Sequence, residues 1–219
     1  MKLEGFSDEK ANVECCMSKI REEFEAEGFH CIYQDTSPKR AGVLTGVLGA
    51  DRPGAPVLFS GHIDTVHPTG SFSKEVFRVE DGRMYGPGVL DMKGGILITL
   101  YVVKALNYLG YHERPIKILF VGDEEADHVD TNVDEIITKE SEGSLCAFLM
   151  EIGNPGNELC VGRKSLYNVY TTITGIGGHS GNFFEKGRNA VHEGVLKTYP
   201  APSLRKSAIN ISWIPEPQA

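Results

Sequence analysis

The sequence predicts an α/β protein with a mixed, largely parallel central sheet flanked by helices. Short apolar runs bounded by turn residues alternate with longer segments in which apolar residues recur every three or four positions. Strands that alternate with helices are typical of a sheet covered on both faces. With 219 residues, 41% of them hydrophobic and 24% charged, the chain is long enough for one sizeable core.

The first predicted element is an amphipathic helix. Ser7 is a suitable N-cap and Gly28 a suitable stop, and the apolar residues between them follow helical spacing: Val13, Met17, Ile20 and Phe24. The remaining predicted elements are, in chain order, strands over 29–33, 43–48 and 57–60, a mostly apolar helix over 94–109, a strand over 116–121, a helix over 133–139 and a strand over 145–150.

Composition and charge argue against several classes of partner. With 30 acidic against 22 basic residues the formal net charge is -8, and lysine and arginine form no patch in the sequence, so we expect neither nucleic acid nor an anionic membrane as a partner. The N-terminus has no apolar signal segment, and the five cysteines have no C-x-x-C spacing. We therefore expect a cytoplasmic location and reduced thiols.

Polar side chains follow three of the predicted strands where each strand ends, and a further one lies in the glycine-rich turn GPGVLDMKGG. These residues are His62 with Asp64, Asp123 with Glu124 and Glu125, Glu151, and Asp91 in the turn. Because ligands bind beyond the carboxyl ends of the strands in open α/β sheets, the groups can converge, and a divalent metal would cancel the repulsion between their carboxylates. We predict that His62 is a metal ligand and that Asp64 fixes its tautomer.

Taken singly, each of these signals has a simpler explanation. A His-x-Asp after a strand is usually a surface turn, a Glu-Glu pair is usually solvated, and Glu151 alone could cap a helix or pair with a lysine. Their occurrence at successive strand ends favours a metal site over a scaffold without metal. Nucleotide binding is disfavoured because GPGVLD and GIGGHS lack the third glycine of G-x-G-x-x-G, and the G-x-S-x-G of a serine nucleophile is absent.

Five motifs in one order give the chain a family resemblance. SGHIDTV, GPGVLDMKGG, GDEE, an isolated glutamate after an apolar strand, and GIGGHSG with GRNA resemble the co-catalytic di-zinc family of metallopeptidases and amidohydrolases. That family contains glutamate carboxypeptidase, acetylornithine deacetylase, succinyl-diaminopimelate desuccinylase and tripeptidase T. The match runs from about Glu9 to His192.

The resemblance implies a role for each site residue. His62 and Glu151 correspond to ligands of one zinc, and Glu125 corresponds to a ligand of the other. Asp91 corresponds to the carboxylate that bridges two cations about 3.5–4 Å apart, followed by a cis peptide bond, and Glu124 corresponds to the general base. The implied activity is hydrolysis of amide bonds in small peptides or N-acyl amino acids, of the carboxypeptidase or deacylase type.

The same resemblance divides the chain into an incomplete metal-binding catalytic domain over residues 1–162 and, over 163–219, part of an inserted α+β lid or dimerisation domain with an atypical C-terminal tail. The lid is expected to begin with a strand over 164–175 and to contain a helix over 187–199. The resemblance also implies that His179 of the GHSG motif stabilises an oxyanion and reaches the site of the other subunit in a homodimer.

The chain departs from the family pattern after the lid segment. The family supplies a second histidine to the second zinc from a return segment, whereas here only His192 follows His179, so we expect a truncated form with an incomplete second site. We therefore expect the chain to bind about one zinc firmly and to hydrolyse its substrates poorly or not at all. The alternative is a catalytically inactive relative that keeps the fold and about one metal and acts by binding or dimerisation.

Overall fold

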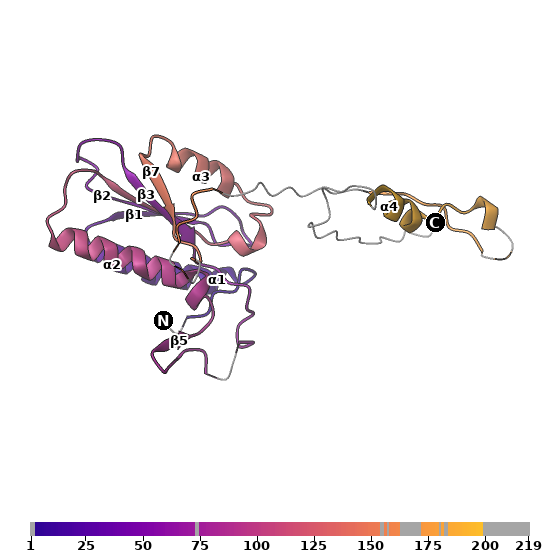
Figure 1. The fold of residues 1–219 in the computed structure, drawn as a ribbon, viewed down its shortest axis with the longest axis horizontal. Helices are drawn as coiled ribbons and strands as arrows, with labels where there is room; N and C mark the ends of the chain where they lie inside the picture. Colours follow the sequence, from indigo (N-terminus) through magenta and orange to yellow (C-terminus); the bar gives the residue numbers. More distant parts are fainter. Residues whose placement is uncertain are drawn as a thin grey trace. The chain divides into compact units, whose positions relative to one another are not determined.

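The computed structural model describes residues 3–72, 75–153, 156, 158–162, 172–179, 181 and 184–198. The chain divides into two compact units, Met1–Cys160 and Val161–Ala219. The first unit contains a five-stranded sheet with its helices, drawn from indigo to orange in Figure 1.

The sheet is mixed, as predicted, and its strand order is β1-β2-β6-β3-β7. The strands are β1 (His30–Gln34), β2 (Val43–Leu48), β3 (Val57–His62), β6 (Ile116–Val121) and β7 (Cys146–Leu149). The β1–β2 and β2–β6 pairs are antiparallel, whereas β3 runs parallel to both β6 and β7.

The register of the parallel strands decides where the strand ends meet. His62 pairs with Val121, so β3 and β6 end at the same level, and Ser60 pairs with Leu149 near the end of β7. The residues that follow these three strands therefore leave the sheet at one edge, which is the edge where the sequence predicts ligands.

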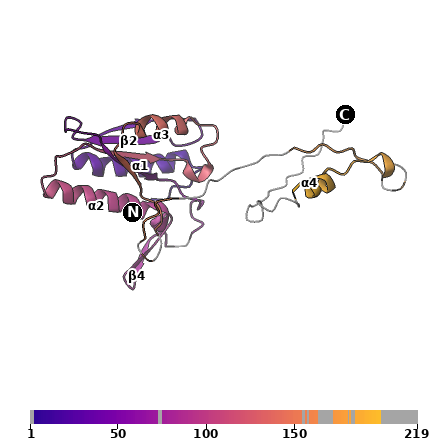
Figure 2. The same ribbon diagram turned by 45° about the horizontal axis from the view of Figure 1, so that its top comes forward.

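Helices cover both faces of the sheet. The helices α1 (Lys10–Ala26) and α2 (Gly94–Tyr108) pack on one face, and α3 (Val133–Ser141) packs on the other, which Figures 1 and 2 show from two directions. Phe24 of α1 is 1% exposed, and its ring lies 5.3 Å from that of Phe29 and 5.6 Å from that of Phe120. Among the described residues, none of the helices has the length and apolar character needed to cross a membrane.

The predicted start of α1 is wrong, while its predicted end is confirmed. The helix begins at Lys10 after Glu9, and Ser7 is instead buried, with its hydroxyl directed at Asp64. Gly28 has a φ of 92°, the left-handed conformation that ends many helices and that glycine adopts at little cost. The other predicted helices and strands of this unit agree with the structure to within two residues at each end.

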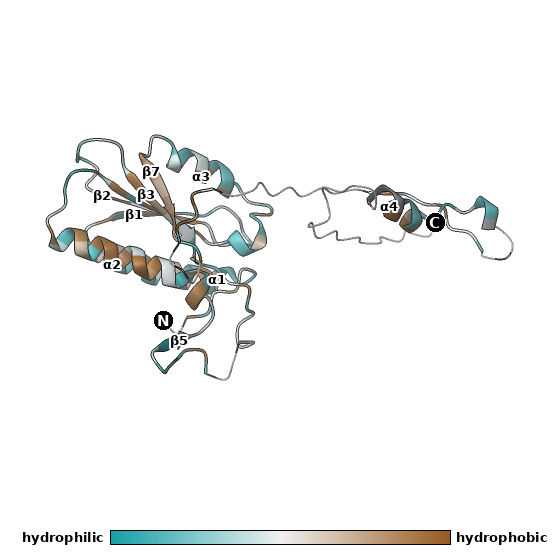
Figure 3. Cartoon of the chain, viewed as in Figure 1, coloured by the Kyte–Doolittle hydropathy of each residue, from teal (hydrophilic) through white to brown (hydrophobic). Residues whose placement is uncertain are grey.

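The segment between β3 and α2 contains three elements that the sequence analysis did not predict. Strands β4 (Arg78–Glu80) and β5 (Arg83–Tyr85) form a hairpin whose turn residues, Asp81 and Gly82, both have positive φ. The π-helical turn η1 (Val89–Lys93) then leads directly into α2. Helix α2 is largely apolar along its length, as Figure 3 shows.

The second unit contains one α-helix among its described residues, α4 (Ala190–Thr198), inside the range predicted for the lid helix. The strand predicted over 164–175 lies mostly outside the described residues, and residues 172–175 are not in a strand. The first unit ends two residues before the boundary that the sequence suggests. The identity of the two units as catalytic and lid domains stays a prediction.

Candidate metal site

The site is centred on His62, the last residue of β3, whose side chain is 1% exposed. Its backbone N–H donates to Met92 Sδ at 2.9 Å. Nδ1 of its ring lies 3.1 Å from the backbone oxygen of Asp64 and 3.3 Å from Oδ1 of the Asp64 carboxylate. Nδ1 therefore faces Asp64, and Nε2 is the ring nitrogen that faces the other carboxylates.

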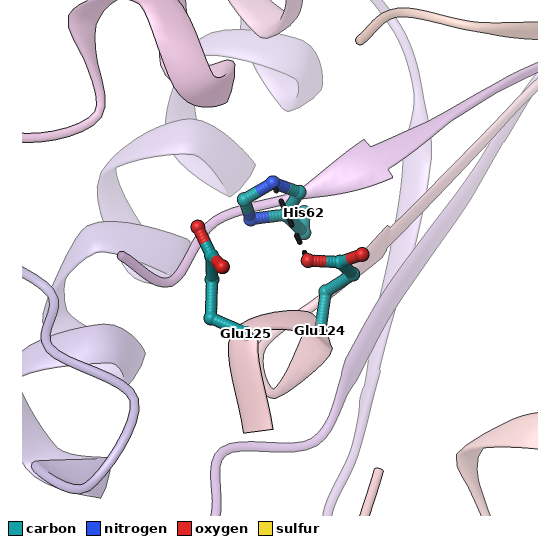
Figure 4. A group of neighbouring side chains, drawn as sticks. All are labelled: His62, Glu124 and Glu125. Atoms are coloured by element: carbon teal, nitrogen blue, oxygen red, sulfur yellow. Dashed lines mark ion pairs between the residues drawn. The ribbon is translucent and has the colours of Figure 1, made fainter. Parts of the chain in front are cut away.

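Three carboxylates lie around Nε2 of His62. The nearest oxygen of Asp91 is 3.0 Å away, that of Glu151 is 3.6 Å away, and that of Glu124 is 3.8 Å away. Glu125 lies on the opposite side of the imidazole from Glu124, as Figure 4 shows. The structure thus brings together the four residues predicted as metal ligands and the residue predicted as the general base.

Asp64 holds the turn that carries the two glutamates. Glu124 and Glu125 lie in the 3₁₀ turn η2 (Glu124–Ala126), so their placement does not come from the alternation of side chains along a strand that the sequence suggests. The N–H of Glu124 donates to Asp64 Oδ1 at 3.2 Å, and the N–H of Glu125 donates to Asp64 Oδ2 at 3.1 Å. Asp64 is 0% exposed. Its buried carboxylate therefore contacts both the His62 ring and the turn that carries the two glutamates.

Asp91 lies in η1, directly before α2, and Glu151 is positioned by close packing against α2. The Asp91–Met92 peptide bond is cis, as the family resemblance implies. Gly95, in the first turn of α2, lies so close to Met150 that a Cβ at this position would stand 1.8 Å from the Met150 backbone oxygen. Met150 precedes Glu151 directly, so this glycine lets the end of β7 approach the helix and brings Glu151 to the site.

The acidic groups and the buried imidazole shift one another's pKa values. Burial lowers the pKa of His62, but the hydrogen bond and charge of Asp64, with the charges of its other neighbours, raise the pKa to about 9. Burial, with the charges of Asp91 and Glu124, raises the pKa of Glu125 and of Glu151 against the attraction of His62. Like charges are therefore crowded here, and a divalent cation would remove their repulsion.

The spacing of the donors fits a metal ion. Two groups have ligand atoms that all lie within 4.8 Å of one another: His62 with Asp91 and Glu151, and His62 with Glu124 and Glu125. Two ligands of a tetrahedral zinc, each about 2.1 Å from the ion, stand about 3.4 Å apart. The separations of 3.0 and 3.6 Å in the first group lie on either side of that value, and imidazole with carboxylate is a usual zinc donor set.

A cavity of about 320 Å³ adjoins this cluster. Asp91 and Glu125 form part of its wall, and the remaining wall includes His67, Phe72 and Tyr85. The cavity is of the size that pockets for small ligands have in other proteins. It leaves space for a small organic group beside Asp91 and Glu125.

Two residues that the sequence analysis singled out, Asp123 and His179, make other contacts. Asp123 is 0% exposed and accepts hydrogen bonds from His128 Nδ1 at 2.7 Å and from the Thr131 hydroxyl at 3.0 Å, so it holds the following loop. His179 lies in the second unit, where its Nδ1 accepts a hydrogen bond from the N–H of Gly181 at 3.1 Å. The predicted role of His179 stays a prediction.

Sequence reasoning missed Ser7 and Met92. Ser7 donates a hydrogen bond of 2.7 Å to Asp64, from which it is 57 residues distant in the sequence. Met92 is 0% exposed and receives the N–H of His62. Neither contact leaves a local pattern in the sequence, although Ser7 does stand out there as a polar residue just before a helix.

Comparisons with known proteins bear on the same residues. The sequence model of peptidase family M20/M25/M40 matches residues 58–164, which contain the whole cluster around His62. Carboxypeptidase G2 from Pseudomonas sp. (strain RS-16) is 33% identical over 198 residues, covering 86% of this chain and 47% of the relative. Succinyl-diaminopimelate desuccinylase from Acidiphilium cryptum (strain JF-5) is 30% identical over 149 residues, covering 64% of this chain and 39% of the relative. The chain spans about half the length, or less, of these curated relatives.

A solved structure agrees with these matches in fold. Aminopeptidase PepT from Bacillus cereus ATCC 10987 has a TM-score of 0.63 to this chain at 17% identity, and the match covers 92% of this chain and 54% of the other. At that identity the likeness shows the fold alone. The family model and the sequence relatives together show that the chain belongs to peptidase family M20/M25/M40, and the solved structure agrees with it in fold.

Proposed function

We propose that this chain is a zinc-dependent hydrolase of amide bonds in small peptides or N-acyl amino acids, of the carboxypeptidase or deacylase type. One observation carries the proposal: Nε2 of the buried His62 faces the carboxylates of Asp91 and Glu151 at separations that suit a shared metal ion. The names of the relatives, a carboxypeptidase and a desuccinylase, support the same class of substrate.

His62, Asp91 and Glu151 would hold one zinc, and Glu125 would hold a second together with Asp91 as the bridge. When bound, zinc supplies a polarised substrate carbonyl and a water of lowered pKa. The protein supplies the ligand atoms and fixes their positions. Asp64 keeps the proton of the imidazole on Nδ1, so that the electron pair of Nε2 points toward the carboxylates.

Glu124 is suited to move the proton. Its carboxylate lies 3.8 Å from His62 Nε2, and its side chain is 48% exposed. Of the two candidate metal groups, it belongs only to the one with His62 and Glu125 and not to the one with Asp91 and Glu151. In the proposed reaction it takes a proton from the attacking water and gives it to the leaving amine, which avoids expulsion of an amide anion. The remaining proposed role is that of His179, which stabilises the oxyanion of the tetrahedral intermediate.

The proposal includes a stoichiometry. Both candidate metal groups in the described part of the chain use the same imidazole, that of His62. A pair of carboxylates without an imidazole of its own holds zinc weakly. We therefore expect about one firmly bound zinc per chain and slow hydrolysis.

The test uses the purified chain titrated with zinc and assayed on dipeptides and N-acyl amino acids. Wild-type protein should bind zinc, His62→Ala should lose the binding, and Glu124→Gln should keep the zinc but lose hydrolysis. Glu135→Gln, an exposed glutamate on α3, is the matched control and should change neither property. Absence of zinc binding in wild type would overturn the proposal, and zinc binding without hydrolysis would favour the inactive relative that acts by binding or dimerisation.

We also propose that the protein forms a homodimer through the lid domain over residues 163–219. We propose a cytoplasmic location, with neither nucleic acid nor membrane as a partner. Sedimentation of the wild-type chain against one that ends at residue 162 tests the dimer. An equal number of subunits per particle in the two proteins would contradict dimerisation through the lid.

A further inference from the structure

A segment near the N-terminus runs beside the loop that follows β3. Phe6 and Thr65 form a parallel bridge, in which the N–H of Thr65 donates to the Gly5 oxygen at 2.8 Å and the N–H of Ser7 donates to the Thr65 oxygen at 3.2 Å. The loop held in this way contains Asp64. Residues 5–7 and the loop after β3 thus lie side by side next to the candidate metal site, although they are distant in the sequence.

Among the hydrogen bonds between these two segments, the one that the Ser7 hydroxyl donates to Asp64 is the shortest. The hydroxyl lies 2.7 Å from Asp64 Oδ2 and 3.2 Å from the Thr65 backbone oxygen. A hydroxyl has one proton to donate, and the shorter contact to a carboxylate is the stronger of the two. Ser7 is 4% exposed and Asp64 is 0% exposed, so bulk water cannot readily replace this bond.

The carboxylate that receives this bond has three other partners. Oδ1 faces His62 Nδ1 and accepts the N–H of Glu124, while Oδ2 accepts the N–H of Glu125. The torsion that rotates an aspartate carboxylate is broad, so the orientation of this group depends on its partners. Ser7 is the one partner in this set that lies outside the end of β3 and the Glu124–Glu125 turn.

The same N-terminal segment also reaches the Asp91 turn. Lys93, in η1 with Asp91, is 8% exposed, and its Nζ donates to the Leu3 backbone oxygen at 3.3 Å. The segment over residues 3–7 therefore binds both the loop after β3 and the turn that carries Asp91. These two pieces of chain meet at His62 and Asp91, whose side chains are 3.0 Å apart.

We propose that Ser7 is a positioning residue, which locks the Asp64 carboxylate in the orientation that holds His62 and the Glu124–Glu125 turn ready for metal. This inference rests on the proposed function, because it assumes that the cluster binds zinc. A serine that served the fold alone would affect stability without a particular effect on the metal. The two roles therefore differ in what Ser7→Ala does to zinc affinity.

The experiment measures zinc affinity by competition with a chelator, and the absorption spectrum of bound Co²⁺, in variants of the full chain. Ser7→Ala should weaken zinc binding by up to about 10-fold, the lower end of the 10- to 100-fold cost of losing a direct partner of a metal ligand, because Ser7 acts on His62 through Asp64; it should also change the Co²⁺ spectrum. Ser7→Thr retains the hydroxyl and should restore both properties. Ser37→Ala is the matched control, because Ser37 is also buried and its hydroxyl accepts the N–H of Lys39 away from the site.

The outcomes separate this inference from the proposed function. Zinc binding by wild type and Ser7→Ala with equal affinity would overturn the role of Ser7 and leave the proposed function intact. Equal weakening by Ser7→Ala and Ser37→Ala would overturn it too, since the effect would then be one of general stability. Failure of wild type to bind zinc would overturn the proposed function itself. Should Ser7→Ala not fold, Ser7→Cys, with its weaker S–H donor, carries the same test with the same expected weakening.

Discussion

Zinc affinity should rise about tenfold for each pH unit between about pH 7 and pH 9. The metal needs the neutral imidazole of His62, whose pKa in the metal-free protein is raised from 6.5 to about 9. The proton is therefore present at neutral pH and must leave when zinc binds. From pH 7 to the plateau above pH 9 the apparent affinity should gain about 100-fold in all, which is about 2.7 kcal/mol at about 1.36 kcal/mol per pH unit. Above about pH 9 the affinity should level off, because His62 is then already neutral.

Chelator competition across this pH range measures the slope, and calorimetry in buffers with different heats of ionisation counts the protons. We expect about one proton released per zinc at pH 7 and about half of one at pH 9. Asp64→Asn removes the charge that most raises the pKa of His62, so it should flatten the slope. His128→Gln, which changes a histidine paired with Asp123, should leave the slope unchanged. A wild-type zinc affinity that does not vary with pH would show that His62 gives up no proton when zinc binds.

Three further predictions concern stability and packing. Metal-free protein should lose about 3 kcal/mol of stability as the pH rises from about 6.5 through about 9, because His62 holds its proton in this range only when folded; equal urea denaturation curves at the two ends would count against this. Gly95→Ala should destabilise the protein by about 1–3 kcal/mol and weaken zinc binding, because its Cβ would meet the Met150 backbone, whereas Gly153→Ala, with open space around it, should do neither. Phe24→Ala should cost about 3–5 kcal/mol in urea denaturation without a change in the proton count on zinc binding; a cost below about 1 kcal/mol would show that this ring is not central to the core.

The sheet and its helices could be predicted because their signals are local. The strands over 43–48 and 116–121 match the structure to the residue, since each is an apolar run bounded by turn residues. The hairpin of β4 and β5 was missed because each strand has only three residues, too few to show an alternating pattern, although the Asp81-Gly82 pair is a usual hairpin turn.

The candidate site could be predicted in composition but not in its supports. The rule that ligands follow strand ends, together with the family resemblance, brings His62, Asp91 and Glu151 together. The turn at Glu124 could not be predicted, because its form depends on backbone N–H groups that bind Asp64, 60 residues earlier in the chain. The contact between Ser7 and Asp64 likewise exists only once the chain has folded.

The metal site at His62 is tested most directly by a crystal structure of the zinc-loaded protein with anomalous scattering recorded at the zinc edge. We expect a zinc peak about 2.0–2.2 Å from Nε2 of His62, with carboxylate oxygens of Asp91 and Glu151 at similar distances. A strong zinc peak elsewhere, with His62 still in contact with Asp91 and no metal between them, would contradict this expectation.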